Sequence, residues 1–200
     1  RGEEWLPSAP IHILLWKYLG WADEMPAWAH LPLILKPDGN GKLSKRDGDR
    51  LGFPVYAMNW TDPKTVDLTQ GFKELGFMPE AFVNLLAVLG WNDGTDKEIF
   101  TLDELKAKFS VERISKAGAK FDFEKAKWFN HEWIKASSVE RLTSSVKSEL
   151  SKSEIEVTDD KKLAEVIELV KDRCTLLPDF VTQTSYFFVS PSEYDSAAVK

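Results

Sequence analysis

The chain has 200 residues, of which 43% are hydrophobic and 29% are charged, a balance typical of a folded globular protein with one or two domains. The formal net charge of −6 disfavours binding of a polyanion by the whole surface, so contact with nucleic acid would need local basic patches. The single cysteine, Cys174, excludes an internal disulfide and a cysteine-cluster zinc site, and no apolar run approaches the ~18 residues of a membrane-spanning helix.

The compartment and the completeness of the chain can be predicted from the same features. One cysteine and the lack of long apolar runs lead us to expect a cytoplasmic protein that does not enter membranes. The chain begins at Arg1 without a methionine or a signal peptide, so we expect it to be part of a longer protein.

The N-terminal stretch is predicted to contain an extended entry, one helix and one strand. We expect residues 1–9 to be extended. Ser8 can cap a helix, Pro10 suits its first turn and Gly20 can end it. Residues 31–35 form a strand candidate, with a proline that places it at a sheet edge. The apolar residues of the helix fall on one helical face: Ile11, Leu14, Leu15, Tyr18 and Leu19.

The segment Lys42–Arg46, with the sequence KLSKR, follows a glycine-rich turn at residues 37–41. We interpret it as a mobile loop that closes late over a polyanion, because lysine ammonium groups can meet phosphate oxygens as charge develops there. A P-loop is excluded, because Lys36 and Leu43 replace its first glycine and its hydroxyl residue. On pattern alone, a solvated surface turn stays open as the alternative. The cations between positions 36 and 50 are Lys36, Lys42, Lys45, Arg46 and Arg50.

The remaining elements follow in chain order. Residues 50–69 are irregular and permit a hairpin arm, because apolar residues alternate loosely between Val55 and Trp60. Helical periodicity and capping residues dominate from residue 70 onward, and the polar stretch 151–160 is interpreted as a linker. The predicted helices span residues 70–75, 79–89, 101–109, 122–133, 138–150, 159–174 and 180–188.

The predicted fold class is therefore mainly α, with a short β and loop segment before the helices. We place a domain boundary near Phe121, where the apolar pattern restarts after the basic stretch 116–120. The resulting organisation is a first segment at 1–50, an insertion with a second helical segment at 51–120, and a helical domain at 121–200.

Several segments of this sequence resemble a known family. KLSKR resembles the KMSKS signature of class I aminoacyl-tRNA synthetases, with Leu43 for Met and Arg46 for the last Ser. The segments RGEEWLPSAP, HLPLILKPDG and KLSKRDGD together resemble bacterial glutamyl-tRNA synthetases, and MPEA, LGW and FDFEKAKWFN extend the likeness over nearly the whole chain. Residues 50–69 depart from the shorter bacterial members, which pass more directly from the signature to the next helix.

This resemblance implies the tail of a nucleotide-binding domain over 1–50, a tRNA stem-contact region up to 120 and an incomplete anticodon-binding domain from 121. It implies catalytic roles for Lys42, Ser44 and Lys45 in a loop that closes over ATP, with Lys45 as the ATP-binding lysine. Arg1 matches an arginine that holds the glutamate substrate, although we expect this first residue to be disordered. Ser44 could donate a hydrogen bond to a phosphate oxygen.

The resemblance also implies contacts with tRNA. Arg173 aligns with an arginine that reads an anticodon base, and the alternative is a cation that only favours the helix end. Lys116 and Lys120 belong to a basic run that could contact phosphates along the tRNA stem, and the alternative is a solvated face. The run consists of Lys108, Arg113, Lys116, Lys120, Lys125 and Lys127.

The function that the resemblance implies for the parent protein is glutamate–tRNA ligation, with ATP as a substrate accompanied by Mg²⁺, and with L-glutamate and the glutamate tRNA as partners. We expect a monomer. His12, His30 and His131 lack partners at ligand spacing, so we expect no metal bound by these residues. The HIGH motif of the family is absent from these residues, so we expect residues 1–200 alone to be inactive. Glutaminyl-tRNA synthetase and a non-catalytic RNA-binding module stay open as alternatives.

Overall fold

The computed structural model describes residues 1–190, apart from the side chains of Lys45, Arg46 and Asp49. The described range is mainly α, which confirms the predicted fold class. The α-helices are α1 (Ala9–Tyr18), α2 (Lys45–Leu51), α3 (Phe72–Leu75), α4 (Pro79–Val88), α5 (Leu102–Lys108), α6 (Phe123–Ala136), α7 (Val139–Lys152), α8 (Asp160–Val170) and α9 (Asp179–Phe188). The 3-10 turns are η1 (Glu3–Ser8), η2 (Ala22–Glu24), η3 (Val111–Arg113) and η4 (Lys171–Arg173). The strands are β1 (Ile34–Leu35), β2 (Trp60–Thr61), β3 (Leu68–Thr69) and β4 (Ala119–Lys120).

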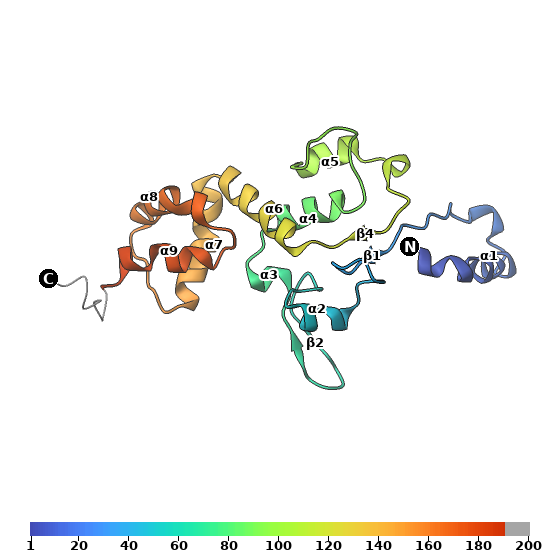
Figure 1. Ribbon diagram of the computed structural model, residues 1–200, viewed down its shortest axis with the longest axis horizontal. Helices are drawn as coiled ribbons and strands as arrows, with labels where there is room; N and C mark the ends of the chain where they lie inside the picture. Colours follow the sequence, from blue (N-terminus) through green and yellow to red (C-terminus); the bar gives the residue numbers. More distant parts are fainter. Residues whose placement is uncertain (191–200) are drawn as a thin grey trace.

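The elements lie in three groups along the longest axis of the molecule (Figure 1). The N-terminal stretch with α1 forms one end, and the strands with α2 to α5 form the middle. Helices α7, α8 and α9 pack on one another at the other end, and α6 runs from the middle towards them. The chain therefore places the KLSKR segment in the middle, between an N-terminal arm and a helical bundle.

A short parallel pair joins two segments that are far apart in the sequence. β1 pairs with β4, with Ile34 opposite Ala119 and Leu35 opposite Lys120. Gly118 makes this approach possible, because a Cβ at that position would lie 2.9 Å from the backbone oxygen of Leu33. The pairing brings the second half of the chain back to the residues that precede KLSKR.

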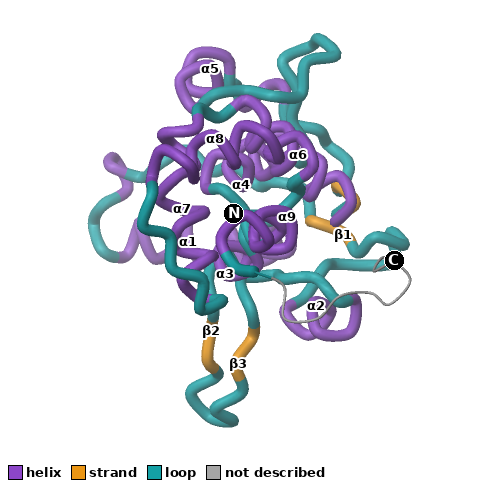
Figure 2. Tube along the Cα trace, turned by 90° about the vertical axis from the view of Figure 1, so that its left-hand side faces the viewer, coloured by secondary structure: helices purple, strands orange, loops and turns teal. Residues whose placement is uncertain are grey.

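The predicted hairpin arm lies within residues 50–69 and begins after α2 ends at Leu51, and its strands β2 and β3 pair in antiparallel register. The arm projects from the body of the molecule (Figure 2). Its base is anchored closely, because Gly71 packs against the backbone of Met58 and a Cβ there would lie 2.1 Å from a backbone carbon. The backbone N–H of Asn59 also donates to Glu74 in α3 at 2.7 Å. The base of the insertion is thus tied to the helix that follows it.

Two apolar cores lie on either side of α4 and α6. The middle core contains five buried phenylalanines and packs the arm, α3, α4 and α6 against one another, with Phe72, Leu85 and Phe129 among its buried residues. The second core lies within α6 to α9 and includes Met78 and Ala81 from the start of α4. Because α4 and α6 contribute to both cores, the two parts of the chain are packed together.

Two buried asparagine side chains reinforce this junction. The Oδ1 atom of Asn130 in α6 accepts the backbone N–H of Met78 at 2.7 Å, and its Nδ2 donates to the backbone oxygen of Thr175 at 2.7 Å. The Oδ1 atom of Asn84 in α4 accepts the indole N–H of Trp133 at 3.1 Å, and its Nδ2 donates to the backbone oxygen of Glu98 at 2.8 Å. Each amide therefore links α4 and α6 and also fixes a loop.

The N-terminal arm differs in part from its sequence predictions. Residues 3–8 form the 3-10 turn η1, because the backbone turns after pairing with Leu31 through the N–H of Glu3 at 2.8 Å. The α1 helix forms with Pro10 in its first turn, but none of its residues is buried. The apolar residues that share one face of α1 are all exposed in the described structure: Ile11, Leu14, Leu15, Tyr18 and Leu19.

Two further helices differ from their predictions. The first is α5, which is capped by Thr101 as predicted but spans only seven residues. It therefore buries Leu105 and leaves Leu102 and Phe109 exposed. The second is α8, which ends at Val170 rather than at Cys174. The chain turns there because the backbone oxygen of Cys174 lies 2.9 Å from the Nδ1 atom of His131 in α6.

The buried amide of Asn130 leads to a stability prediction. Asn130→Ala leaves the N–H of Met78 and the carbonyl of Thr175 buried without partners, so the free energy of unfolding should fall by about 1–3 kcal/mol. The exposed Asn92, whose Oδ1 accepts only the nearby Gly94 N–H, offers the control Asn92→Ala, with an expected change of about 0.5 kcal/mol. Urea unfolding measures both, and equal losses would contradict the role of Asn130.

Candidate functional site

The KLSKR segment is tied to β1 on one side and to α2 on the other. The N–H of Leu43 donates to Ile34 at 2.8 Å, and the N–H of Lys36 donates to Gly41 at 3.0 Å, which closes the turn that precedes the segment. Gly41 has a φ of +89°, a value that suits glycine. Ser44 is the N-cap of α2, so the last two residues of the segment begin a helix. The prediction of a loop over the whole segment is therefore wrong for its second half.

Asp47 is a buried carboxylate that holds this segment together. One of its oxygens accepts the N–H of Ser44 at 2.9 Å and the hydroxyl of Ser44 at 2.5 Å. The other lies 3.1 Å from the ammonium of Lys36 and 3.3 Å from the guanidinium of Arg50. Sequence reasoning missed Asp47, although the spacing of a serine and an acidic residue three positions later was a signal of helix capping.

The surroundings of Asp47 also fix its charge. The hydroxyl and the N–H of Ser44, followed by Lys36 and Arg50, hold the pKa of the Asp47 carboxyl well below its usual value, against the opposing effect of burial. Because the pKa is lowered on folding, this stabilisation is complete above the ordinary aspartate pKa. It is lost progressively as the pH falls from that ordinary value to the lowered one.

Lys42 is paired as well. Its ammonium forms an ion pair with Glu4 of η1, and this hydrogen bond is the main reason why the pKa of Glu4 is lowered. The neighbouring Glu3 accepts the N–H of Leu33 at 3.3 Å. Each of these adjacent, exposed carboxylates therefore connects η1 to a different part of the β1 region.

Arg1 has contacts within the N-terminal arm. Its guanidinium lies 2.9 Å from the Nδ1 atom of His12, and it stacks over the ring of Trp5 at 5.0 Å from the centroid. The disorder expected for Arg1 stays a prediction. His12 in turn stacks on Trp28 at a centroid distance of 5.9 Å, so the arginine belongs to a small aromatic cluster.

The predicted basic run divides into paired and unpaired cations. Lys108 pairs with Asp93 at 2.7 Å and Lys125 pairs with Glu98 at 2.6 Å. Lys127 pairs with Glu124 at 2.8 Å. Lys116 and Lys120 are exposed and form no ion pair with any described side chain.

Lys120 lies close to the KLSKR turn rather than apart from it. Its Cε atom is 2.6 Å from the position that a Cβ of Gly39 would take, so the side chain crosses the turn at a glycine. The parallel pairing of Lys120 with Leu35 produces this placement. Among the sequence-predicted tRNA residues, Lys120 is thus the one that the fold brings next to the KLSKR segment.

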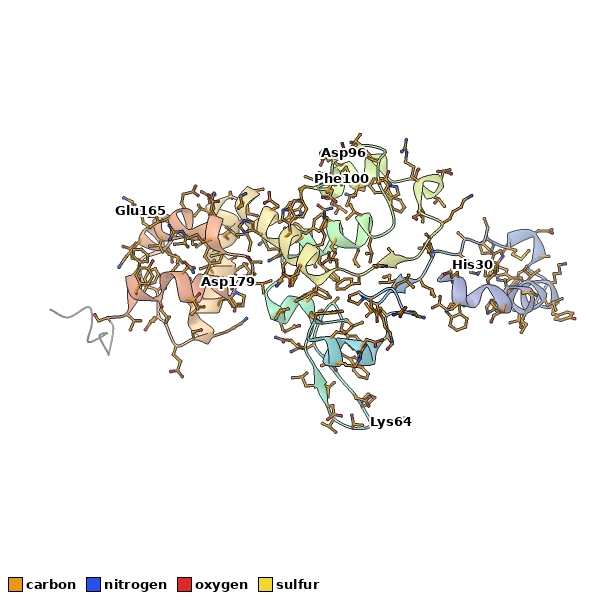
Figure 3. All side chains as sticks on the ribbon, viewed as in Figure 1. His30, Lys64, Asp96, Phe100, Glu165 and Asp179 are labelled. Atoms are coloured by element: carbon orange, nitrogen blue, oxygen red, sulfur yellow. The ribbon has the colours of Figure 1, made fainter. Side chains whose placement is uncertain are left out.

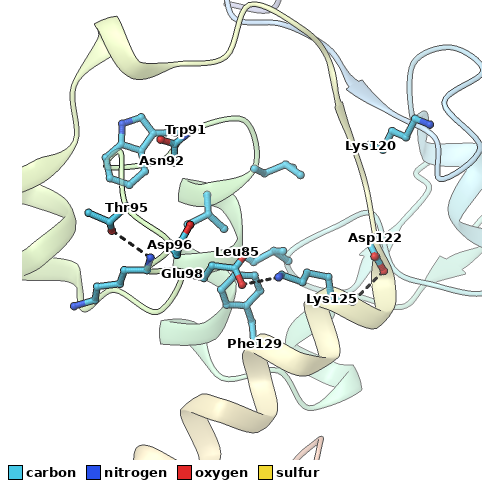
Figure 4. A pocket seen from close by; sticks show the side chains of 13 residues that line it. Leu85, Trp91, Asn92, Thr95, Asp96, Glu98, Lys120, Asp122, Lys125 and Phe129 are labelled. Atoms are coloured by element: carbon cyan, nitrogen blue, oxygen red, sulfur yellow. Dashed lines mark hydrogen bonds and ion pairs between the residues drawn. The ribbon is translucent and has the colours of Figure 1, made fainter.

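A cavity of about 550 Å³ lies beside Lys120, between α4, the loop 91–98 and the start of α6 (Figure 4). Leu85, Trp91 and Phe129 contribute apolar walls, and Asp96 and Glu98 contribute carboxylates. The Glu98 carboxylate is already paired with Lys125, as the dashed line in Figure 4 marks. The charges in the described part of this cavity are therefore mixed rather than uniformly positive.

Arg173 lies in η4, the turn that follows α8, and its side chain is exposed. Within the described range it has no salt bridge, whereas Lys171 of the same turn pairs with Glu168 at 2.8 Å. The loop that follows is held by Asp179 at the start of α9, whose carboxylate accepts the N–H groups of Thr175 and Leu176 at 2.8 and 2.9 Å (Figure 3). Arg173 is therefore carried on a well-anchored turn.

The described residues contain neither a metal-binding cluster nor a membrane-spanning helix. Among residues 1–190, no three histidine, cysteine, aspartate or glutamate side chains converge in a way that could hold a metal ion. No helix in the described part is long and apolar enough to cross a membrane.

Comparisons with known proteins cover the whole chain. Residues 1–128 match the family model described as tRNA synthetases class I (E and Q), catalytic domain, and residues 124–200 match an anticodon binding domain. The chain is 56% identical to a glutamate–tRNA ligase of Phocaeicola vulgatus and 52% identical to one of Porphyromonas gingivalis, over 100% of its length and 39% of theirs.

Solved structures give the same result. A glutamate tRNA ligase from Elizabethkingia meningosepticum, crystallised in complex with its amino acid, superimposes with a TM-score of 0.87 at 45% identity. A glutamate-tRNA synthetase from Elizabethkingia anophelis superimposes with a TM-score of 0.85. Both matches cover 99% of this chain and 39% of the other chain, so the chain spans about two fifths of the length of these relatives.

Cys174, next to Arg173, should be chemically inert in the folded protein. Its side chain is fully buried, and burial raises the pKa of the thiol to about 12, so almost no thiolate exists near neutral pH. A thiol reagent such as Ellman's reagent should therefore release about one equivalent of product only after denaturation. Rapid reaction of the native protein would show that the η4 turn opens, and would contradict the anchored position given to Arg173.

Proposed function

Because this chain belongs to the class I tRNA synthetases of the glutamate and glutamine group, we propose that it is the signature-bearing and tRNA-binding part of a glutamate–tRNA ligase. The whole protein would join glutamate to ATP to form glutamyl-adenylate and pyrophosphate. It would then transfer the glutamyl group from the adenylate to the 3′ end of its tRNA, with release of AMP. The ligase would act as a cytoplasmic monomer.

This proposal rests on one observation: the signature segment and a helical bundle are packed together in the same chain. The KLSKR segment caps a helix beside β1, and α6 to α9 follow as a helical bundle. Glutaminyl-tRNA synthetase shares the signature, but its anticodon region is built from β-barrels, whereas the described residues from 123 to 188 are helices and turns. The identity to glutamate–tRNA ligases supports the same choice. An isolated RNA-binding module would have no need of the signature.

We propose that Lys45 binds ATP and stabilises the charge that develops on the leaving pyrophosphate. Its side chain lies outside the described residues, so the proposal rests on the signature and on the placement of its backbone at the first position of α2. Lys42 would take part after exchanging its partner Glu4 for phosphate oxygens. The Ser44 hydroxyl already donates to Asp47, and a contact with phosphate would require that it leave this partner.

Glutamate and Mg²⁺ are the other small partners that we propose beside ATP. Arg1 would hold the carboxylate of glutamate, since a guanidinium can bind a carboxylate through two parallel hydrogen bonds. In this structure its guanidinium is beside His12, which would have to share it. Mg²⁺ would arrive with ATP, and the described residues include no carboxylate cluster that would hold it.

The exposed face of α1 supports the proposal that the chain works as part of a larger protein. Tyr18 is 82% exposed, and Ile11 and Leu15 are exposed as well. Apolar patches of this kind mark surfaces that other protein segments cover. Because the relatives are more than twice as long as this chain, we propose that the rest of the ligase packs on this face.

The tRNA would contact two regions of the chain. Lys116 and Lys120 would bind phosphates near the signature, where unpaired ammonium groups can replace counterions without first breaking an ion pair. Arg173 would reach the anticodon loop, because an exposed guanidinium can hydrogen-bond to a base edge or stack on an unpaired base. As part of the same proposal, the chain divides into the tail of a nucleotide-binding domain at 1–50, an insertion with a tRNA stem-contact region at 51–120 and an anticodon-binding domain at 121–200.

The role of Lys45 can be tested in the whole protein by glutamate-dependent exchange of pyrophosphate into ATP, measured in the presence of tRNA. Lys45→Ala should lower the exchange rate by about 10²–10³, because it removes one group that stabilises developing charge. Binding of tRNA should change little.

Lys64 at the tip of the hairpin arm is the matched control (Figure 3). Lys64→Ala removes the same charge away from the signature, and its exchange rate should stay within about twofold of the wild type. Normal exchange with weakened tRNA binding in Lys45→Ala would reverse the proposed role. Absence of any glutamate-dependent exchange in the wild type would refute the proposed function.

Arg173 can be tested by charging tRNA variants that differ at single anticodon positions. If Arg173 reads a base, Arg173→Ala should cost about 1–3 kcal/mol of discrimination at one position. Lys171→Ala is the control, because Lys171 lies in the same turn but pairs with Glu168. Equal effects of Arg173→Ala on all variants would show a phosphate contact instead, and a loss of stability alone would show a purely structural role.

A further inference from the structure

The carboxylate of Asp47 joins three separate points of the signature region. Lys36 ends the β1 segment, Ser44 starts α2, and Arg50 lies in the last turn of α2. Asp47 is only 6% exposed, so water competes weakly for its carboxylate oxygens. A single buried group thus connects the strand, the cap and the end of the helix.

The hairpin arm supports the same helix from the other side. A Cβ on Gly48 would lie 2.6 Å from a methyl of Val55 and 2.8 Å from the backbone oxygen of Phe53. Residue 48 is therefore pressed against the first residues of the insertion, with no room for a side chain. Because Asp47 and Gly48 are adjacent, the helix is held by a polar contact on one side and by close backbone packing on the other.

We propose that Asp47 is a positioning residue for the signature, which sets the backbone on which Lys42 and Lys45 are carried. The capping contacts fix where α2 begins, and the pair with Lys36 fixes α2 relative to β1. Lysines that must meet a developing charge lose most of their effect when they are misplaced by about 1 Å. The catalytic consequence rests on the proposed function, whereas the structural consequence does not.

The chain contains a matched control for this arrangement at the start of α5. There the N–H of Thr101 donates to Glu104 at 2.9 Å, and the ammonium of Lys97 pairs with Glu104 at 2.5 Å. The capping pattern and the paired lysine thus repeat those of Ser44, Asp47 and Lys36. A variant at Glu104 therefore removes the same kind of contacts at a helix that carries no signature residue.

The experiment compares Asp47→Ala and Asp47→Asn with Glu104→Ala and Glu104→Gln in the whole protein. Hydrogen exchange at the capped amides, those of Ser44 and Thr101, measures each helix start without any assay of activity. Asp47→Ala should accelerate exchange at Ser44 by about fivefold, the effect expected when a helix cap is lost. Asp47→Asn should have a smaller effect, because an amide oxygen can still accept the N–H.

Glutamate-dependent pyrophosphate exchange then separates positioning from general stability. Asp47→Ala should lower kcat by about 10- to 100-fold, with Asp47→Asn in between and the KM for glutamate unchanged. Glu104→Ala should accelerate hydrogen exchange at Thr101 alone and leave kcat within about twofold.

Two results would overturn the proposal. Unchanged hydrogen exchange at Ser44 in Asp47→Ala would show that the carboxylate does not hold the helix start. Equal losses of kcat in Asp47→Ala and Glu104→Ala would show a general effect of stability rather than positioning. If the wild type showed no glutamate-dependent exchange, the proposed function would fall, and hydrogen exchange at Ser44 would still decide whether Asp47 holds the signature.

Discussion

The packing of α4 against α6 is the constraint on which the rest of the structure depends. α4 contributes Leu85 to the middle core and Ala81 to the helical core, and α6 contributes Phe129 and Ile134 in the same way. A junction shared by two cores cannot shift without disturbing both, because protein interiors are close-packed. The buried amides of Asn84 and Asn130 fix its register further, since their hydrogen bonds specify one arrangement.

This junction connects the signature with the distant helical bundle. The chain leaves α4, passes through α5 and returns as β4 beside β1, directly before α6 begins. The strand pair therefore fixes the signature turn to the start of the helix that leads into the bundle. In an enzyme that must bind one end of a tRNA near the signature and the other on the bundle, such a rigid path would keep the two contacts at a constant separation.

Local features of the structure could be predicted from the sequence. Thr101, Asp122, Ser138 and Asp159 all cap helices where their position before an apolar periodic run indicated a helix start. These predictions succeed because a cap depends on residues only three positions apart. The hairpin arm also follows from a local alternation of apolar residues.

Features that depend on distant contacts could not be predicted. β4 has two residues and no strand periodicity, and only its partner β1 makes it a strand. Asp47 pairs with Lys36, and Lys42 pairs with Glu4. The spacing of these residues along the sequence does not reveal that they lie close together in space. The apolar stripe of α1 was predicted correctly as a pattern, but the pattern does not say what covers it.

We propose that this chain belongs to a ligase that charges tRNA with glutamate. The most direct measurement is ATP-dependent attachment of labelled glutamate to the glutamate tRNA by the whole protein, with labelled glutamine and the glutamine tRNA as the parallel reaction. Glutamate should be attached, whereas glutamine should not. Attachment of glutamine, or binding of tRNA without attachment of either amino acid, would contradict this proposal.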